Sequence, residues 1–257
     1  MKIYEPAGRA REYSPLALNF KQGCNHNCNY CYVPTMFKRY NVSYRHDVEI
    51  CNPNFLEIEK SAKKYYGCDK QILLSFTGDP YSGNNNDDTT KILEILLKYN
   101  HKVSILTKGG SKCLNDIELF KKFGDKIKVG ATLTFDNESD SIYWESGAAL
   151  PFERIRTLKK LAENGIKTWV SFEPVIIPSQ SLALLEDVSS FIDSVKIGKI
   201  NNFNGLDKKI DWNKFIKEAV FICRSKNIPF YIKKDLQKFN KETLLYPEEL
   251  DEDFLNL

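Results

Sequence analysis

The sequence predicts an α/β fold, a partial parallel (β/α)6 barrel of the TIM-like type, and three observations point to it. Six short apolar runs are bounded by turn residues, amphipathic stretches lie between most of them, and 42% of the 257 residues are hydrophobic. Buried strands that alternate with amphipathic helices are typical of βα units, whose strands run parallel. Functional residues of such a fold lie on the loops that follow the strands.

The apolar runs predict the strands, in this order along the chain: Leu16–Phe20, Gln71–Phe76, Lys102–Thr107, Ile127–Thr134, Thr168–Glu173 and Ser194–Ile197. Between them, apolar residues three and four positions apart predict helices over Thr89–Tyr99, Leu114–Phe123 and Phe152–Gly165. Gly165 is the expected C-terminal cap of the last of these helices. The alternation therefore predicts consecutive βα units.

The chain shows no internal repeat, no low-complexity tract and no Pro/Gly/Ser-rich linker, which favours one main domain. We expect this domain to span residues 1–228, including an N-terminal lead-in to the first strand. Residues 229–257 are the expected C-terminal extension, packed on the barrel. Within this extension, PFYIKKD is a candidate further strand and PEELDEDF is an acidic, solvated segment.

Composition and charge indicate a soluble globular protein without an obvious partner class. Lysine and arginine number 37 against 34 aspartates and glutamates, so no strong basic field indicates nucleic-acid binding, although a local basic patch stays open. No uninterrupted apolar run approaches a membrane span, and Met1–Ala10 lacks the apolar core of a signal peptide. We therefore expect a cytoplasmic protein with no membrane partner.

Three of the seven cysteines, Cys24, Cys28 and Cys31, lie together in GCNHNCNYCYVP. A reducing compartment favours metal or redox roles for such a group. Three thiolates on one loop can hold three irons of a [4Fe–4S] cluster and leave the fourth iron open for chemistry. One alternative is a zinc site closed by His26 or a distant cysteine, and another is a set of unrelated buried thiols. The other four cysteines are scattered and predict no second cluster.

The CxxxCxxC spacing, with Tyr30 before the last cysteine, resembles the signature of the radical S-adenosylmethionine superfamily. The resemblance implies that the open iron binds the amino and carboxylate groups of S-adenosylmethionine. One electron from the reduced cluster then splits the sulfur–carbon bond and gives a 5′-deoxyadenosyl radical, while the protein supplies positioning and excludes water. A one-electron donor such as flavodoxin or ferredoxin is the implied partner.

Four segments, NCNYCY, TGDPY, LTKGG and WESGAALPFERIRTLKKLAENGI, are similar to successive motifs of the spore photoproduct lyase-like branch, and the likeness runs from about Tyr13 to about Pro178. It implies that Lys108 contacts S-adenosylmethionine with help from Thr132. Glu145 and Arg154 match a paired glutamate and arginine that steady the site. Tyr30 and Tyr32 match tyrosines associated with hydrogen transfer, and Tyr30 is also expected beside the cofactor. The alternatives are a surface salt bridge for the charged pair and packing for the tyrosines.

The ends of the second and fourth predicted strands add to this set. By the resemblance, Thr77, Gly78 and Asp79 lie where the methionine amino group is received, and the alternative is a plain turn that Gly78 and the Asp79–Pro80 step allow. Lys108 follows the third strand, where a lone lysine is otherwise a solvated one. Thr132 or Thr134 offers an inward hydroxyl, but threonine also simply favours strands.

One position departs from the branch. Phe76 stands where the lyase has a cysteine that donates hydrogen, and phenylalanine has no hydrogen of comparable lability. Only 23 residues precede Cys24, fewer than in the lyase. We therefore expect a radical enzyme that abstracts hydrogen from another substrate, with a nucleic acid base or nucleotide as the first candidate. The alternatives are the lyase reaction itself and a non-catalytic iron–sulfur or zinc protein.

Overall fold

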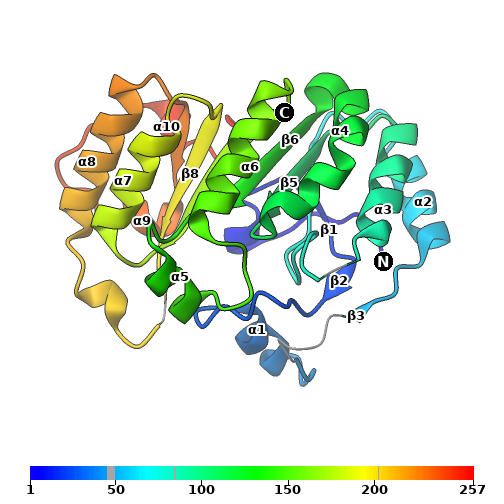
Figure 1. Cartoon of the computed structure of the whole chain (residues 1–257), viewed down its shortest axis with the longest axis horizontal. Coiled ribbons are helices and arrows are strands. Elements are labelled where there is room, and N and C mark those ends of the chain that lie inside the picture. The colour runs from blue at the N-terminus through cyan, green and yellow to red at the C-terminus, as the bar shows by residue number, and fades with distance from the viewer. Residues whose placement is uncertain (45–49, 84, 202) are drawn as a thin grey trace.

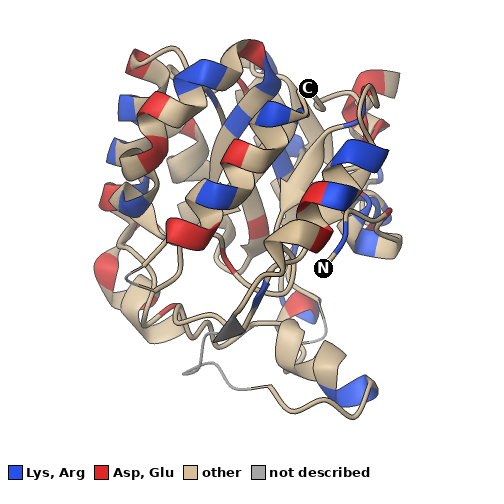
Figure 2. Ribbon diagram, turned by 90° about the vertical axis from the view of Figure 1, so that its right-hand side faces the viewer, with Lys and Arg blue, Asp and Glu red and all other residues tan. Residues whose placement is uncertain are grey.

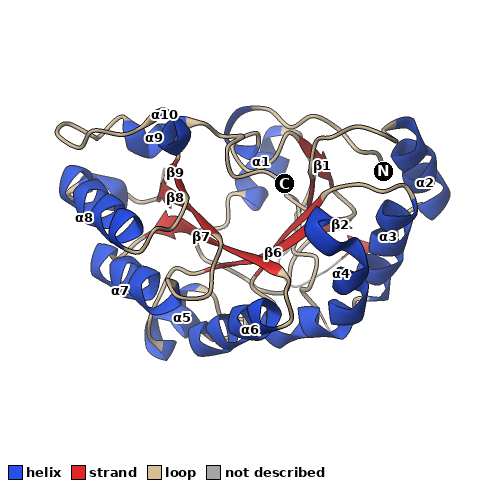
Figure 3. Ribbon diagram, turned by 90° about the horizontal axis from the view of Figure 1, so that it is seen from above, coloured by secondary structure: helices blue, strands red, loops and turns tan. Residues whose placement is uncertain are grey.

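The computed structural model describes residues 1–44, 50–83, 85–201 and 203–257. Its main element is a seven-stranded sheet in the order β1-β4-β5-β6-β7-β8-β9, in which every neighbouring pair is parallel. The strands are β1 (Leu16–Leu18), β4 (Ile72–Leu74), β5 (Val103–Thr107), β6 (Ile127–Thr132), β7 (Lys167–Val175), β8 (Ser194–Lys199) and β9 (Phe230–Ile232). The sheet curves into a half-barrel with the larger helices on its outer face (Figures 1 and 3). The predicted partial barrel is confirmed.

Each of the six predicted strands is present, and the candidate strand in PFYIKKD is β9, the last strand of the sheet. The residues after position 229 thus contribute an edge strand and pack on the barrel through it. A separate two-stranded antiparallel ribbon joins β2 (Lys21–Gln22) and β3 (Ile50–Cys51).

The helices follow the strands as βα units require. They are α1 (Val33–Arg39), α2 (Phe55–Lys64), α3 (Asp87–Lys98), α4 (Ile117–Phe123), α5 (Glu138–Trp144), α6 (Pro151–Glu163), α7 (Pro178–Val188), α8 (Trp212–Ser225), α9 (Lys234–Gln237) and α10 (Pro247–Leu250), with 3₁₀ turns at Gly8–Ala10, Gly110–Asp116, Gly124–Lys126 and Leu206–Lys208. The helix predicted over Leu114–Phe123 therefore begins later, at Ile117. Asp116 explains the tight turn before it, because its buried carboxylate accepts hydrogen bonds from Tyr81 and Thr90, both at 2.7 Å.

Side chains alternate between the two faces of the sheet, and this alternation separates an apolar core from a polar inner face. On β8, Val195 and Ile197 belong to the apolar cluster under the helices, whereas Lys196 between them reaches Glu12 and Tyr13 of the N-terminal lead-in. A second apolar cluster lies beneath α2, α3 and α4. Lysine, arginine, aspartate and glutamate are mixed on the outer helices (Figure 2).

The two ends of the strands carry different segments. Helix α1 and the loop before it lie at the carboxyl ends, at the bottom of Figure 1, and the C-terminus lies at the opposite end. There Lys128, near the start of β6, donates a hydrogen bond to the carbonyl oxygen of Leu255 at 2.6 Å. Among the described residues, no helix combines the length and apolar character that spanning a membrane requires.

Candidate active site at the carboxyl ends of the strands

The three clustered cysteines lie on the loop between β2 and α1, and each thiol is half-buried. The loop pairs with the segment that joins α5 to α6. Cys28 forms an antiparallel bridge with Glu145, and the Asn29 amide donates to the carbonyl oxygen of Trp144 at 2.8 Å. Within the loop, the Cys31 amide donates to the Cys28 carbonyl oxygen at 3.0 Å. The cysteine loop is therefore fixed by backbone pairing with a segment far away in the sequence.

Gly147 allows this pairing to be close. A Cβ atom at this position would overlap the carbonyl oxygen of Asn25 and would lie 3.0 Å from its carbonyl carbon. The Gly147 amide also donates to the carbonyl oxygen of His26 at 3.0 Å. Because the obstructing atoms belong to the backbone of the cysteine loop, a side chain here would displace the loop itself.

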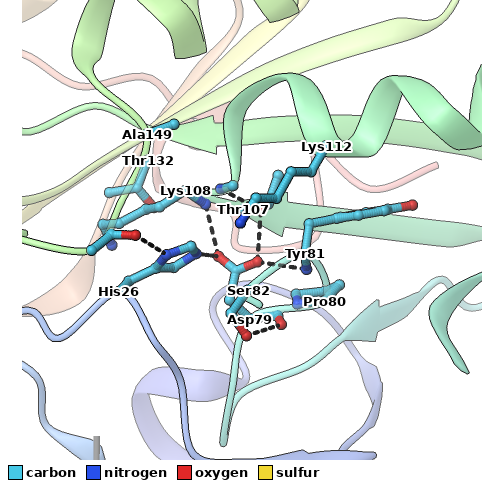
Figure 4. Close-up of polar contacts among 12 residues, drawn as sticks. His26, Asp79, Pro80, Tyr81, Ser82, Thr107, Lys108, Lys112, Thr132 and Ala149 are labelled. Carbon is cyan, nitrogen blue, oxygen red and sulfur yellow. Dashed lines mark hydrogen bonds and ion pairs between the residues drawn. The ribbon is translucent and has the colours of Figure 1, made fainter. Parts of the chain in front are cut away.

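His26 connects the cysteine loop to the loop after β4 (Figure 4). Its imidazole is 3% exposed, with Nδ1 3.2 Å from the carbonyl oxygen of Gly147 and Nε2 3.1 Å from Asp79 Oδ2. The zinc alternative made His26 a metal ligand, but both ring nitrogens face oxygen atoms of the chain.

Asp79 is the centre of the polar contacts in Figure 4. Besides His26, it accepts hydrogen bonds from the Thr107 hydroxyl at 2.6 Å, the Lys108 amide at 2.7 Å and the Tyr81 amide at 2.8 Å. Burial acts to raise the pKa of Asp79, but His26 and these donors outweigh it and hold the pKa well below its usual range. A carboxylate has about four lone-pair positions, so the contacts leave Asp79 little capacity for a cofactor. The geometry favours a positioning role.

Lys108 lies at the end of β5 in a buried charged group. Its Nζ is 4.0 Å from Glu145 Oε1 and 5.5 Å from the centre of the Tyr30 ring. Arg154 donates to Glu145 Oε2 at 2.5 Å, to the Ala149 carbonyl oxygen at 2.7 Å and to the Thr132 carbonyl oxygen at 2.9 Å. Glu145 and Arg154 are each 1% exposed, so the surface salt bridge considered for them is wrong.

The charges in this group stabilise one another. Burial acts to lower the pKa of Lys108, but Cys28 in its thiolate form and the Glu145 carboxylate outweigh it and raise the pKa. Burial likewise acts to raise the pKa of Glu145, and Arg154 and Lys108 outweigh it and lower the pKa. The Tyr30 hydroxyl donates to Glu145 as well. The site therefore keeps a buried cation directly beside the cysteine loop.

Burial and the charge of Lys108 act on the three thiols in opposite directions. Burial raises the pKa of Cys28 to about 11, against the effect of Lys108, and burial also raises the pKa values of Cys24 and Cys31. Each thiol feels the positive charge of Lys108, and metal coordination deprotonates a thiol outright. Among the described residues, no group of three or more His, Cys, Asp or Glu side chains is arranged to hold a metal ion. Mononuclear zinc needs ligands that converge on one point, whereas a four-iron cluster binds each thiolate at a separate iron.

The remaining predicted residues lie around this group. The Thr77 hydroxyl donates to the Lys21 carbonyl oxygen at 2.6 Å, and Gly78 passes so close to the same loop that a Cβ would lie 2.7 Å from the Gly23 carbonyl oxygen. Thr132 is 4% exposed at the end of β6. Tyr32 is 56% exposed, and its hydroxyl donates to the Phe76 carbonyl oxygen at 2.8 Å. The fold thus brings the predicted residues to one end of the sheet.

Sequence reasoning missed the structural roles of His26, Gly147 and Thr107. His26 was visible as the middle residue of CNHNC, and its place between two cysteines was the available signal. Nothing in the local sequence indicates that Gly147 contacts Asn25, because the contact joins two segments that the barrel brings together.

Comparison with known proteins identifies the family. The model of the radical SAM superfamily matches residues 18–192, more than half of the chain. The chain belongs to the radical SAM superfamily. An uncharacterised protein of Acidianus two-tailed virus is 28% identical over 202 residues, and an uncharacterised protein of Methanocaldococcus jannaschii is 34% identical over 159 residues. These matches cover 74% and 60% of this radical SAM chain but only 65% and 58% of the relatives' own lengths, less than two thirds in each case.

Solved structures share the fold of this radical SAM protein at low sequence identity. A spore photoproduct lyase double mutant with bound AdoMet and dinucleoside spore photoproduct superposes with a TM-score of 0.68 at 12% identity, covering 88% of this chain and 78% of that one. Streptococcus suis SuiB bound to S-adenosylmethionine gives 0.64 at 16% identity, covering 90% and 53%. The likeness confirms the half-barrel fold.

Proposed function

We propose that the chain is a radical S-adenosylmethionine enzyme that abstracts hydrogen from a nucleic acid base or nucleotide. In this proposal Cys24, Cys28 and Cys31 hold a [4Fe–4S] cluster with one open iron. The observation that carries it is the cysteine loop, which is clamped at the carboxyl ends of the strands beside the buried cation of Lys108. When bound, the cluster and S-adenosylmethionine would supply the 5′-deoxyadenosyl radical, and the protein would bind and orient the reactants.

In this proposal the chain's own residues neutralise the charge of the cofactor and position the cysteine loop. Lys108 presents a buried ammonium that can pair with the carboxylate of S-adenosylmethionine. Asp79 fixes the backbone of Lys108, and the Glu145–Arg154 pair fixes the segment that clamps the cysteine loop. We place Gly78 and Thr132 on the cofactor side, where the missing side chain of Gly78 lets its backbone pass close to the cysteine loop.

The two tyrosines differ in what they can offer a substrate. The Tyr30 hydroxyl donates to Glu145, and its ring lies beneath Lys108, which suits a positioning role beside the cofactor. Tyr32 follows Cys31 directly and keeps an exposed ring. Of the two, Tyr32 is the residue we propose for hydrogen transfer with the substrate.

The nucleobase class rests on fold likeness to an enzyme whose structure contains a dinucleoside photoproduct, together with the motifs of that branch. Phe76 argues against the lyase reaction itself, because no thiol stands at this position to return hydrogen to a product radical. We also propose a cytoplasmic location and a one-electron donor such as flavodoxin or ferredoxin.

Iron analysis tests the proposal. Changing any one of Cys24, Cys28 or Cys31 to alanine should leave a labile or incomplete cluster after anaerobic reconstitution, because each removes one ligand. The matched controls are Cys113→Ala and Cys223→Ala, whose thiols are buried elsewhere in the core, and these should keep the iron and sulfide of the parent. A colourless parent protein that carries zinc and forms no 5′-deoxyadenosine with a reductant would refute the radical reaction.

A further inference from the structure

A second polar group lies on the inner face of the sheet, over β7, β8 and the end of β9. Lys233 Nζ donates to Glu173 Oε2 at 2.5 Å, and Tyr13 donates its hydroxyl proton to the same oxygen. Since Tyr13 has used its proton, Ser171 donates to the Tyr13 oxygen, at 2.9 Å. Lys233 also lies 3.7 Å from Glu12 Oε2 and 4.3 Å from the centre of the Tyr13 ring.

Gly198 of β8 makes room for this pair. A Cβ atom there would lie 2.8 Å from Glu173 Cδ and 2.9 Å from Lys233 Cδ, so the two side chains meet directly over its bare backbone. Glycine inside a strand often marks the close approach of another group. The position at the carboxyl ends of parallel strands is the one where such folds bind substrates.

The contacts within the protein leave one carboxylate oxygen of the Glu173–Lys233 pair without a hydrogen bond in the described part of the chain. Within the described part of the chain, Glu173 Oε1 receives no hydrogen bond, and the side chain is 17% exposed although Lys233 is only 3% exposed. A buried ion pair contributes little stability over apolar residues of the same volume. A structural role alone therefore leaves both the charges and the open carboxylate oxygen unexplained.

A chain of contacts links the pair to the cysteine loop. Tyr32, next to Cys31, donates its hydroxyl to the backbone of Phe76, and the Phe76 ring meets the Tyr13 ring edge-on with centres 6.2 Å apart. Tyr13 then contacts Glu173. Lys108 lies at the end of β5, and Glu173 lies on β7, with β6 between the two strands. The cofactor residues and this pair therefore face the two halves of one inner surface.

We propose that Glu173 and Lys233 bind the edge of the substrate's nucleobase, an inference that rests on the proposed function and extends it. A base presents a donor and an acceptor side by side, which complements the open oxygen of Glu173 and the ammonium of Lys233 beside it. A trans peptide bond directs its carbonyl and N–H to opposite sides and cannot meet both groups at once. The aromatic rings of Tyr13 and Phe76 at this place suit a flat ring.

Equilibrium dialysis with the cluster-reconstituted protein tests the assignment. The probes are thymidine, deoxycytidine, deoxyadenosine and deoxyguanosine, with triglycine as the backbone-amide probe. The parent should bind one or more nucleosides, and Glu173→Gln should weaken that binding about ten-fold or more, the loss expected of one hydrogen bond to a charged acceptor. Glu186→Gln, an exposed change on α7, should bind as the parent does.

Formation of 5′-deoxyadenosine without nucleoside separates this inference from the proposed function. Glu173→Gln should still form 5′-deoxyadenosine, because the contacts of Glu173 in the described part of the chain involve neither Lys108 nor a cysteine. Equal nucleoside affinity in variant and parent, or binding of triglycine alone, would overturn the assignment while cofactor cleavage persists. A parent that cleaves no S-adenosylmethionine refutes the proposed function instead. Glu173→Asp, which retracts the carboxylate, serves as a second variant if the first does not fold, and it should lose nucleoside binding likewise.

Discussion

The carboxyl and amino ends of the strands both bury charged side chains, but they use them differently. At the carboxyl end, Asp79, Lys108 and Glu145 hold backbone segments around the cysteine loop and leave the thiols half-buried. Further toward the amino ends, Lys128 and Lys196 donate to the carbonyl oxygens of Leu255, Glu12 and Glu252 and so fix the two terminal segments over the sheet. The first arrangement positions the cysteine loop, whereas the second holds the terminal segments against the open half-barrel.

This difference predicts that substitutions at the two ends have separable effects. A change at the carboxyl end should alter iron content or cofactor affinity more than stability. A change at the amino end should alter the free energy of unfolding and leave the iron content intact.

The largest effect is expected from Gly147→Ala. The added methyl group would overlap the Asn25 carbonyl oxygen, and backbone cannot move aside as a side chain can, so the cysteine loop should shift away from α5. Most of the iron should be lost on reconstitution. The neighbouring change Ser146→Ala removes only the exposed hydrogen bond that Asn27 donates to its hydroxyl at 3.2 Å, so it should retain the iron. Iron and sulfide assays measure the contrast. Full iron content in Gly147→Ala would show that the clamp does not position the cluster.

Gly147 also illustrates which contacts the sequence alone could not predict. The strands and the cysteine motif could be predicted because periodicity and spacing are local properties of the chain. The contact of Gly147 with Asn25 and the pairing of Glu173 with Lys233 join residues that only the curvature of the sheet brings together. Asp79 was predicted as a cofactor contact from its place in TGDPY, but only Tyr81 of its four partners belongs to that motif, and the others come from the cysteine loop and the end of β5.

Lys108→Ala is expected to act on the cofactor alone. Removing the ammonium should weaken S-adenosylmethionine binding by roughly ten- to a hundred-fold, because a charge-assisted pair in a buried place is lost. Cluster assembly should persist, because the lysine contacts Glu145 and the Tyr30 ring and is not one of the proposed cluster ligands. Titration of the reconstituted variant with S-adenosylmethionine measures the change. Lys112 is half-buried and its Nζ donates to the Gly83 carbonyl oxygen, so the exposed Lys226→Ala is the control. An unchanged affinity for S-adenosylmethionine would show that Lys108 does not contact the cofactor.

The smallest effect belongs to the amino end and depends on pH. Burial, with Lys233 nearby, lowers the pKa of Lys196 to about 7, although Asp253, Glu12 and Glu252 oppose the shift. In the unfolded chain this lysine keeps its proton up to about pH 10.4.

Between these two values the unfolded state binds more protons than the folded state, so the free energy of unfolding should rise with pH. Below pH 7 both states are protonated, and the contribution no longer changes. From pH 7.5 to pH 9 the rise from this one group should be about 1–2 kcal/mol, since each pH unit contributes at most about 1.4 kcal/mol. Chemical denaturation under reducing conditions measures it, and Lys196→Met should abolish this part of the rise while the exposed Lys226→Met keeps it.

Iron content should stay at the parent's level in both variants, because Lys196 contacts the terminal segments and not the cysteine loop. A fall in iron with Lys196→Met would mean that the two ends of the barrel are coupled and that the division between site and closure does not hold.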